Sequence, residues 1–147
     1  MKALVRRPSP RLAEGIVTHI ERSDVDVELA FAQWERYVAT LADAGFEIVE
    51  LPRADDCPDG VFVEDVLVVD GDLAVVTRPG AEPRRRETDG LAELVASLDF
   101  RVSKLAAPAT LDGGDVLALG KTVFVGLGGR TNREGASQLA ALLAPHG

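Results

Sequence analysis

The sequence DVLVVDGDLAVVT, which runs from Asp65 to Thr77, predicts two strands joined by a tight turn. Asp-Gly between two apolar runs is one of the strongest local signals for a β-hairpin. We expect the first strand to span Val61–Val69 and the second to span Leu73–Thr77, joined through Asp70-Gly71-Asp72.

The same pattern recurs fifty residues later. Strands expected at Asp115–Leu119 and Thr122–Gly126 repeat the first pair, and an amphipathic helical pattern follows each pair. A period near 50 residues indicates one supersecondary unit used more than once. Each unit would hold a hairpin, a helix and a further strand. Small sheets repeated radially in this way build a propeller-like α/β body with the helices outside.

Other elements are expected on both sides of the hairpins. Asp24 or Asp26 is a candidate N-cap for a helix that ends near Ala44, where Gly45 suits the left-handed position after a helix. The last helix is expected to begin at Thr131, which has the spacing of a capping box. The remaining predicted elements are strands at Ala3–Arg6, Phe46–Leu51 and Arg101–Leu105 and a helix at Glu87–Leu98.

Composition limits the classes of function. The chain has 147 residues, a net charge of −8 and a sequence pI near 4.7, so generic binding to nucleic acid or to an anionic membrane is disfavoured. No apolar run is long enough to span a bilayer, and the N-terminus lacks the apolar core of a signal peptide. The single cysteine, Cys57, excludes an internal disulfide framework, and His19 and His146 have no metal-ligand spacing. These features predict a cytoplasmic protein without a bound metal.

Carboxylates are concentrated between Asp55 and Asp65. Asp59, Glu64 and Asp65 lie against an apolar run, where charge is costly to bury unless it is paired. Adjacent residues of a strand face opposite sides, so one of Glu64 and Asp65 is expected to point into a polar site or to meet an arginine. For Asp55 and Asp56 we favour a solvated loop. A solvated loop stays open as the alternative for the other three acids.

Two further groups could contribute chemistry. Asp112 precedes Gly113-Gly114, a pair that permits close backbone approach and can present the carboxylate into a cavity; an ordinary turn is the alternative. Arg84-Arg85-Arg86 and Arg130 follow the two hairpins at corresponding places, where an arginine can bind a carboxylate through two hydrogen bonds. Their alternative is simple solvation.

The candidate groups together predict the chemistry of a ligand. Acids suit a guanidinium group and arginines suit a carboxylate, so an arginine-like amino acid would satisfy both. Cys57 is interpreted as non-catalytic, because neighbouring acids disfavour its thiolate.

Four motifs resemble those of the dimethylarginine dimethylaminohydrolases. They are PDGVFVED at 58–65, TRPGA at 77–81, TLDGGDVL at 110–117 and VFVGL at 123–127, the last followed by Arg130-Thr131-Asn132. Their order and spacing hold across nearly the whole chain. The resemblance implies an α/β fold of the five-fold ββαβ propeller type. The chain would form one incomplete domain over residues 1–147. It would supply about the first half of the propeller, up to three of its five modules.

The resemblance also implies an activity. The family hydrolyses asymmetric dimethylarginine or monomethylarginine to citrulline and a methylated amine. A cysteine attacks the guanidinium carbon, a covalent thiouronium intermediate forms, and a histidine acts as acid and base. No cofactor is needed.

The family's site residues can be placed on this sequence one by one. Asp112 matches the acidic catalytic residue. Asp65 matches the acid that faces the guanidinium, and Glu64 the acid at the α-amino end. The other substrate-binding matches are Asp59, Arg84 and Arg130, the two arginines for the α-carboxylate, and Ile16 for a residue of the lid loop.

The match has no counterpart for the catalytic cysteine and histidine. Cys57 precedes the acidic motif and does not match the nucleophile. We therefore expect a fragment of an enzyme, one half of a split enzyme or a degenerate relative, and expect the 147-residue chain alone to be inactive. Arginine deiminase-like or amidinotransferase-like activity and a non-catalytic arginine-binding module stay open as alternatives. The expected partner is a methylated arginine, with a homodimer or a complementing C-terminal half as the protein partner.

Overall fold

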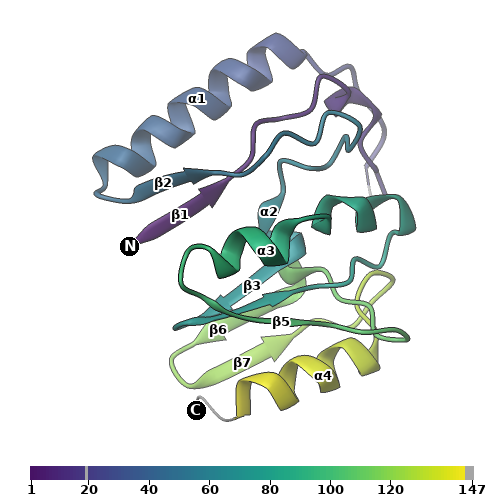
Figure 1. Cartoon of the computed structure of the whole chain (residues 1–147). Coiled ribbons are helices and arrows are strands. Elements are labelled where there is room, and N and C mark those ends of the chain that lie inside the picture. The colour runs from purple at the N-terminus through teal and green to yellow at the C-terminus, as the bar shows by residue number, and fades with distance from the viewer. Residues whose placement is uncertain (19, 145–147) are drawn as a thin grey trace. The chain divides into compact units, whose positions relative to one another are not determined.

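Both predicted hairpins are present in the computed structural model, which describes residues 1–18 and 20–144 (Figure 1). The first is antiparallel β3 (Leu67–Asp70) and β4 (Leu73–Val76); the second is β6 (Val116–Leu119) and β7 (Thr122–Val125). Gly71 and Gly120 occupy equivalent turn positions with φ of +58° and +59°. Glycine adopts that conformation without the steric cost that a side chain adds, so both turns are tight.

Contacts divide the chain into two units, residues 1–63 and 64–147, and each is described by itself. In the first unit β1 (Lys2–Val5) pairs in parallel with β2 (Glu47–Glu50), and α1 (Val27–Asp43) connects them. Trp34 is the buried residue of α1, and the guanidinium of Arg7 lies 4.9 Å from its ring centre. The predicted strands and helix of this unit are confirmed to within a few residues.

The ends of α1 follow from its capping residues. The side chain of Asp26 accepts a hydrogen bond of 2.9 Å from the backbone N–H of Leu29, which decides between the two predicted N-caps. At the other end Gly45 has a φ of +88°, as expected for the residue after a helix.

Replacing Asp26 with alanine is expected to lower the free energy of unfolding by about 1 kcal/mol, because the substitution leaves the Leu29 N–H without its cap. Chemical denaturation measures the change. Asp24→Ala is the matched control, since Asp24 is exposed and lies outside the helix. Equal losses from the two variants would contradict the assignment of the cap.

The second unit begins with a complete ββαβ arrangement. A 3-10 helix over Glu82–Thr88 and then α3 (Leu91–Ala96) follow the first hairpin, and β5 (Arg101–Lys104) adds in parallel to β4. The second hairpin and α4 (Arg133–Leu143) repeat the first three parts of this order. The core cluster that joins the two repeats contains Leu73, Val75, Leu105, Ala109, Leu111 and Leu139.

Three local predictions are wrong. The strand predicted over Val61–Val69 begins only at Leu67, because Val63–Val66 forms the short helix α2. The predicted helix over Glu87–Leu98 has α-helical geometry only from Leu91, since the preceding turns are 3-10. Asn132, and not Thr131, caps α4, because its side chain accepts a 2.7 Å hydrogen bond from the N–H of Gly135.

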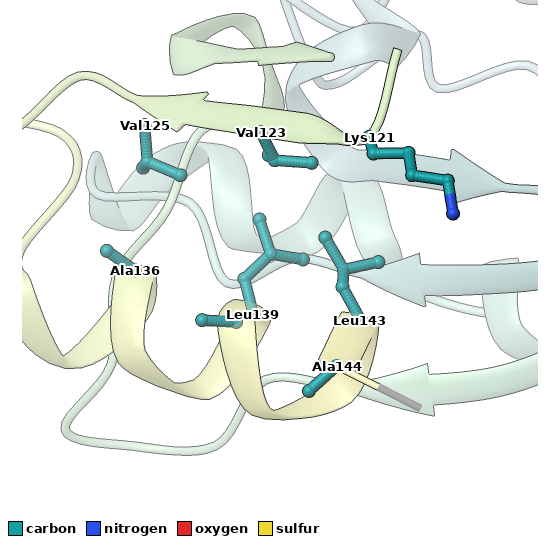
Figure 2. A pocket seen from close by; sticks show the side chains of 8 residues that line it. Lys121, Val123, Val125, Ala136, Leu139, Leu143 and Ala144 are labelled. Carbon is teal, nitrogen blue, oxygen red and sulfur yellow. The ribbon is translucent and has the colours of Figure 1, made fainter. Parts of the chain in front are cut away.

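β7 and α4 enclose an apolar groove of about 230 Å³ (Figure 2). Val123 and Val125 of the strand face Ala136, Leu139 and Leu143 of the helix across it. Within the part of the chain that the structure describes, β6 and β7 form a two-stranded sheet, so β7 has no strand at the edge that corresponds to the β5 edge of β4.

No helix among the described residues is long and apolar enough to cross a membrane. The same residues contain no group of three or more His, Cys, Asp or Glu side chains arranged to hold a metal ion. His19 and His146, and the predicted end of the last helix at 145–147, lie outside the described residues.

Candidate active site

The carboxylate of Asp65 is held from two sides. Its Oδ2 accepts a 2.5 Å hydrogen bond from Nη1 of Arg84, and its Oδ1 accepts one of 3.1 Å from the backbone N–H of Gly114. The hydroxyl of Thr77 donates to the Asp65 carbonyl at 2.7 Å, which ties α2 to the residue that follows β4. The side chain of Asp65 nevertheless stays 20% exposed, so part of it faces solvent.

Asp112 is buried and fixed in a similar way. Its Oδ1 accepts a hydrogen bond of 2.9 Å from the backbone N–H of Gly80, and its Oδ2 accepts one of 3.2 Å from Nη1 of Arg130. The Asp112 backbone N–H donates to the hydroxyl of Thr131, which itself donates to Asp115. Backbone and side chain of Asp112 are therefore both held in one orientation.

Two glycines let the Asp112 segment approach α2. A Cβ atom on Gly113 would lie 2.0 Å from the carbonyl oxygen of Glu64, and one on Gly114 would lie 2.6 Å from Oδ1 of Asp65. Neither position has room for a side chain, so the Gly-Gly pair is what brings the Asp112 segment against the Glu64-Asp65 segment. The Gly113-Gly114 sequence permits such a close backbone approach, and the structure contains it.

Arg84 lies between two carboxylates. Its Nε and Nη2 donate to Oε1 and Oε2 of Glu87 at 2.9 and 2.8 Å, and its Nη1 donates to Asp65. Burial opposes the charged form, but the hydrogen bonds and charges of Glu87 and Asp65 outweigh it and raise the pKa of Arg84 above its ordinary value. Arg84 is therefore a permanent cation that joins the two acids.

The first unit contains a separate pair of predicted site residues. The backbone N–H of Ile16 donates to both carboxylate oxygens of Asp59, at 3.2 and 3.1 Å. Arg22 donates to the carbonyl of Gly15 at 2.7 Å and so helps to hold the same loop. The structure thus brings Asp59 and Ile16 together, although they are 43 residues apart in the chain.

The predicted site residues therefore fall into two sets. Asp59 and Ile16 lie in the first unit, and the second unit holds Glu64, Asp65, Arg84, Asp112 and Arg130. Glu64 is exposed on α2. Asp55 and Asp56 are also exposed, in the loop before it, which agrees with the solvated loop expected for these two acids. Cys57 is a buried free thiol. The roles assigned to these residues stay predictions.

The family described as N,N dimethylarginine dimethylhydrolase, eukaryotic, matches residues 16–144. That range includes every predicted site residue. The chain belongs to the dimethylarginine dimethylaminohydrolase family. The α/β fold and the family predicted from the sequence motifs are therefore confirmed.

Individual members of the family match over almost the whole chain. A dimethylarginine dimethylaminohydrolase of Streptomyces coelicolor is 58% identical over 99% of this chain and 57% of its own length. The corresponding Pseudomonas aeruginosa protein is 36% identical over 98% of this chain and 57% of its own length. The chain thus spans a little more than half the length of these relatives.

Solved structures agree with the family assignment. A mutant of the Pseudomonas aeruginosa dimethylarginine dimethylaminohydrolase, complexed with citrulline, has a TM-score of 0.91 and 35% identity and covers 97% of this chain and 56% of that one. The N-terminal domain of ArgZ, described as an arginine dihydrolase from cyanobacteria, matches with a TM-score of 0.82 but only 21% identity over 96% of this chain and 54% of that domain, so it shows the fold alone.

Sequence reasoning missed two contributors to the site. Gly80 belongs to the TRPGA motif, but nothing in that motif predicts that the Gly80 N–H holds Asp112, a contact that spans 32 residues. Glu87 appeared in the sequence analysis only as the first residue of a predicted helix. The spacing of Arg84 and Glu87, three residues apart on a helical turn, is the signal that would have predicted their pairing.

Proposed function

We propose that the protein containing this chain hydrolyses Nω-methylated arginines to citrulline and a methylated amine. One observation carries the proposal: the Gly113-Gly114 pair packs the Asp112 segment against Glu64-Asp65, so two fixed carboxylates stand on neighbouring segments. Carboxylates accept charge-assisted hydrogen bonds from the N–H groups of a guanidinium. The names of the relatives and the citrulline complex of a solved family member support the same substrate class.

The proposed roles follow the expectations from the sequence. Asp112 is the catalytic acid residue, in contact with the guanidinium nitrogens, and Asp65 is the substrate-binding acid beside it. Glu64 and Asp59 are proposed to contact the amino-acid end, with Ile16 in the lid loop. Arg130 and Arg84 are proposed to take the α-carboxylate; in this structure both contact the protein's own acids.

The proposed reaction is a two-step substitution at the guanidinium carbon. A cysteine thiolate attacks that carbon, its carbon–nitrogen bond to the methylated nitrogen breaks, and the amine leaves with a proton from a histidine. Water then attacks the thiouronium carbon, and its two protons pass to the histidine and to solvent. The carbon–sulfur bond breaks, citrulline forms and the thiolate is regenerated. Cys57 is buried and is not proposed as the nucleophile, so the 147-residue chain alone is expected to be inactive.

A direct assay of the full-length protein tests this function. With asymmetric dimethylarginine as substrate, equal amounts of citrulline and dimethylamine are expected, and unmethylated arginine should react far more slowly. Release of ammonia from arginine as the main reaction would favour an arginine deiminase-like activity instead. Binding of arginine analogues without any product would favour the non-catalytic binding module.

The apolar groove between β7 and α4 favours a further segment of protein that packs beside β7. We propose that a strand parallel to β7 covers Val123 and Val125, as β5 lies parallel to β4 in the preceding repeat. A longer chain or a complementing C-terminal half would supply it, and a homodimer is the alternative. The intact mass of the natural protein separates a longer single chain from the other two sources, because only a longer chain exceeds 15.6 kDa. We place the protein in the cytoplasm.

A further inference from the structure

The four residues from Asp112 to Asp115 form one tight turn, which we call the Asp112 turn. The backbone N–H of Asp115 donates to the carbonyl of Asp112 at 3.0 Å and closes the turn, which has 3-10 geometry over Gly113–Asp115. The turn begins with the carboxylate of Asp112, and its Gly114 N–H donates to the carboxylate of Asp65 at 3.1 Å. Both acids that are proposed to face the guanidinium therefore depend on the shape of this one turn.

The hydroxyl of Thr131 contacts both ends of the Asp112 turn. Its oxygen accepts a hydrogen bond of 3.1 Å from the backbone N–H of Asp112, and its proton is donated to Oδ2 of Asp115 at 2.5 Å. Thr131 is only 1% exposed, so water has little access to the first of these bonds. A single buried side chain from outside the turn thus joins its first residue to its last.

The chemistry of the three groups fixes the direction of both hydrogen bonds. A backbone N–H only donates and an ionised carboxylate only accepts, whereas a hydroxyl has one proton to donate and lone pairs with which to accept. The proton of the Thr131 hydroxyl therefore lies toward Asp115, and a lone pair lies toward the Asp112 N–H. A valine of nearly the same shape would fill the space but would take this partner from both groups.

Both members of this link are themselves anchored in the second repeat. The carbonyl of Asp115 accepts a hydrogen bond of 2.8 Å from the N–H of Gly126, the residue that follows β7. Thr131 directly precedes Asn132, the capping residue of α4. The Asp112 turn is therefore held between the end of β7 and the start of α4.

We propose that Thr131 and Asp115 are positioning residues that hold the Asp112 turn in the shape that its two acids need. In that shape the carboxylates of Asp112 and Asp65 meet the guanidinium group of the substrate together. The inference rests on the proposed function, which gives both acids that task. Thr131 and Asp115 act through the turn and do not touch substrate. A displacement of reacting groups by about 1 Å can lower a rate about 100-fold, so a link outside the reacting groups can control turnover.

Thr131→Val in the full-length protein removes the hydroxyl and keeps the shape of the side chain. With asymmetric dimethylarginine we expect kcat to fall about 10- to 100-fold while KM changes little, because alignment in the transition state is lost and most binding contacts stay. Thr131→Ser keeps the hydroxyl and should restore most of kcat. Thr40→Val is the matched control: Thr40 donates its hydroxyl proton to the carbonyl of Arg36 on the exposed side of α1, so both constants should stay at wild-type values.

Amide hydrogen exchange in the same variants measures the turn directly and independently of activity. Exchange at Asp112 and Gly114 should be faster in Thr131→Val than in the wild type and should return toward the wild-type rate in Thr131→Ser. A general loss of stability would instead accelerate exchange in β4 by the same factor. That result would assign Thr131 a purely structural role and overturn the inference.

Asp115 supplies a second pair of variants if Thr131→Val does not fold. Asp115→Asn keeps an oxygen that accepts the Thr131 proton and Asp115→Ala keeps none, so only Asp115→Ala should lose kcat and exchange protection. Wild-type kcat in Thr131→Val and Asp115→Ala, a rise in KM alone, or a loss that serine at position 131 does not recover would each contradict the inference. If the wild-type protein released no citrulline from asymmetric dimethylarginine, the proposed function would fail, and the exchange rates would still decide whether Thr131 holds the turn.

Discussion

Turnover of asymmetric dimethylarginine by the full-length protein is expected to fall about 100- to 10,000-fold when Asp112 is replaced by asparagine. Asparagine has nearly the same shape and can still accept the hydrogen bond from the Gly80 N–H. It cannot carry the negative charge that stabilises a guanidinium or a protonated histidine. Steady-state kinetics measures the loss, and the substituted protein should remain folded because the volume of the side chain is kept.

Asp99→Asn is the control for this experiment. Asp99 is exposed and has a φ of +69°, a conformation that asparagine adopts readily. Its replacement should leave turnover at the wild-type rate. Near-wild-type kinetics in Asp112→Asn, with the fold verified by circular dichroism, would remove Asp112 from the proposed catalytic group.

Replacing Arg84 with methionine is expected to lower the free energy of unfolding by about 3–5 kcal/mol. The large effect arises because the substitution leaves Glu87 buried without its bidentate partner and removes one support of Asp65. Denaturant-induced unfolding followed by tryptophan fluorescence and by circular dichroism measures the loss. The double variant Arg84→Met with Glu87→Leu should recover part of it, since no uncompensated charge then stays at the Glu87 position.

An exposed pair supplies the control. Arg101 makes two hydrogen bonds to Asp72 on the surface, so Arg101→Met should leave the free energy of unfolding close to that of the wild type. If Arg84→Met and Arg101→Met had equal effects, burial of the ion pairs of Arg84 would have no energetic consequence. The two variants thus compare a buried arginine with an exposed one.

The elements that were predicted well are those with local signals. An Asp-Gly turn between two apolar runs predicted the first hairpin, its recurrence fifty residues later predicted the second, and Gly45 marked the end of α1. The strand predicted at Arg101–Leu105 is confirmed by β5, and its parallel pairing with β4 is a finding of the structure. In each case the information lies within a few residues or within one period, so that a single sequence suffices.

The elements that were missed depend on distant contacts. The run from Val61 to Val69 has a strand-like composition, yet α2 forms within it, and Gly113 packs against the Glu64 carbonyl from 49 residues away. The argument that Glu64 and Asp65 face opposite sides of a strand therefore does not apply. The arginine partner expected for one of these acids is present, because Asp65 meets Arg84, but its buried counter-ion Glu87 was not predicted.

The pairing of the strands also bears on the order in which the chain folds. The two hairpins close loops of two residues, whereas β1 must find β2 across the 17-residue helix α1, and β4 must find β5 across α3. Closing a longer loop costs more chain entropy before any contact compensates it. The hairpins are therefore the natural nuclei of the second unit, and the parallel pairs form after them. We expect Asp65 and Asp112, whose positions depend on contacts between one repeat and the next, to reach those positions late.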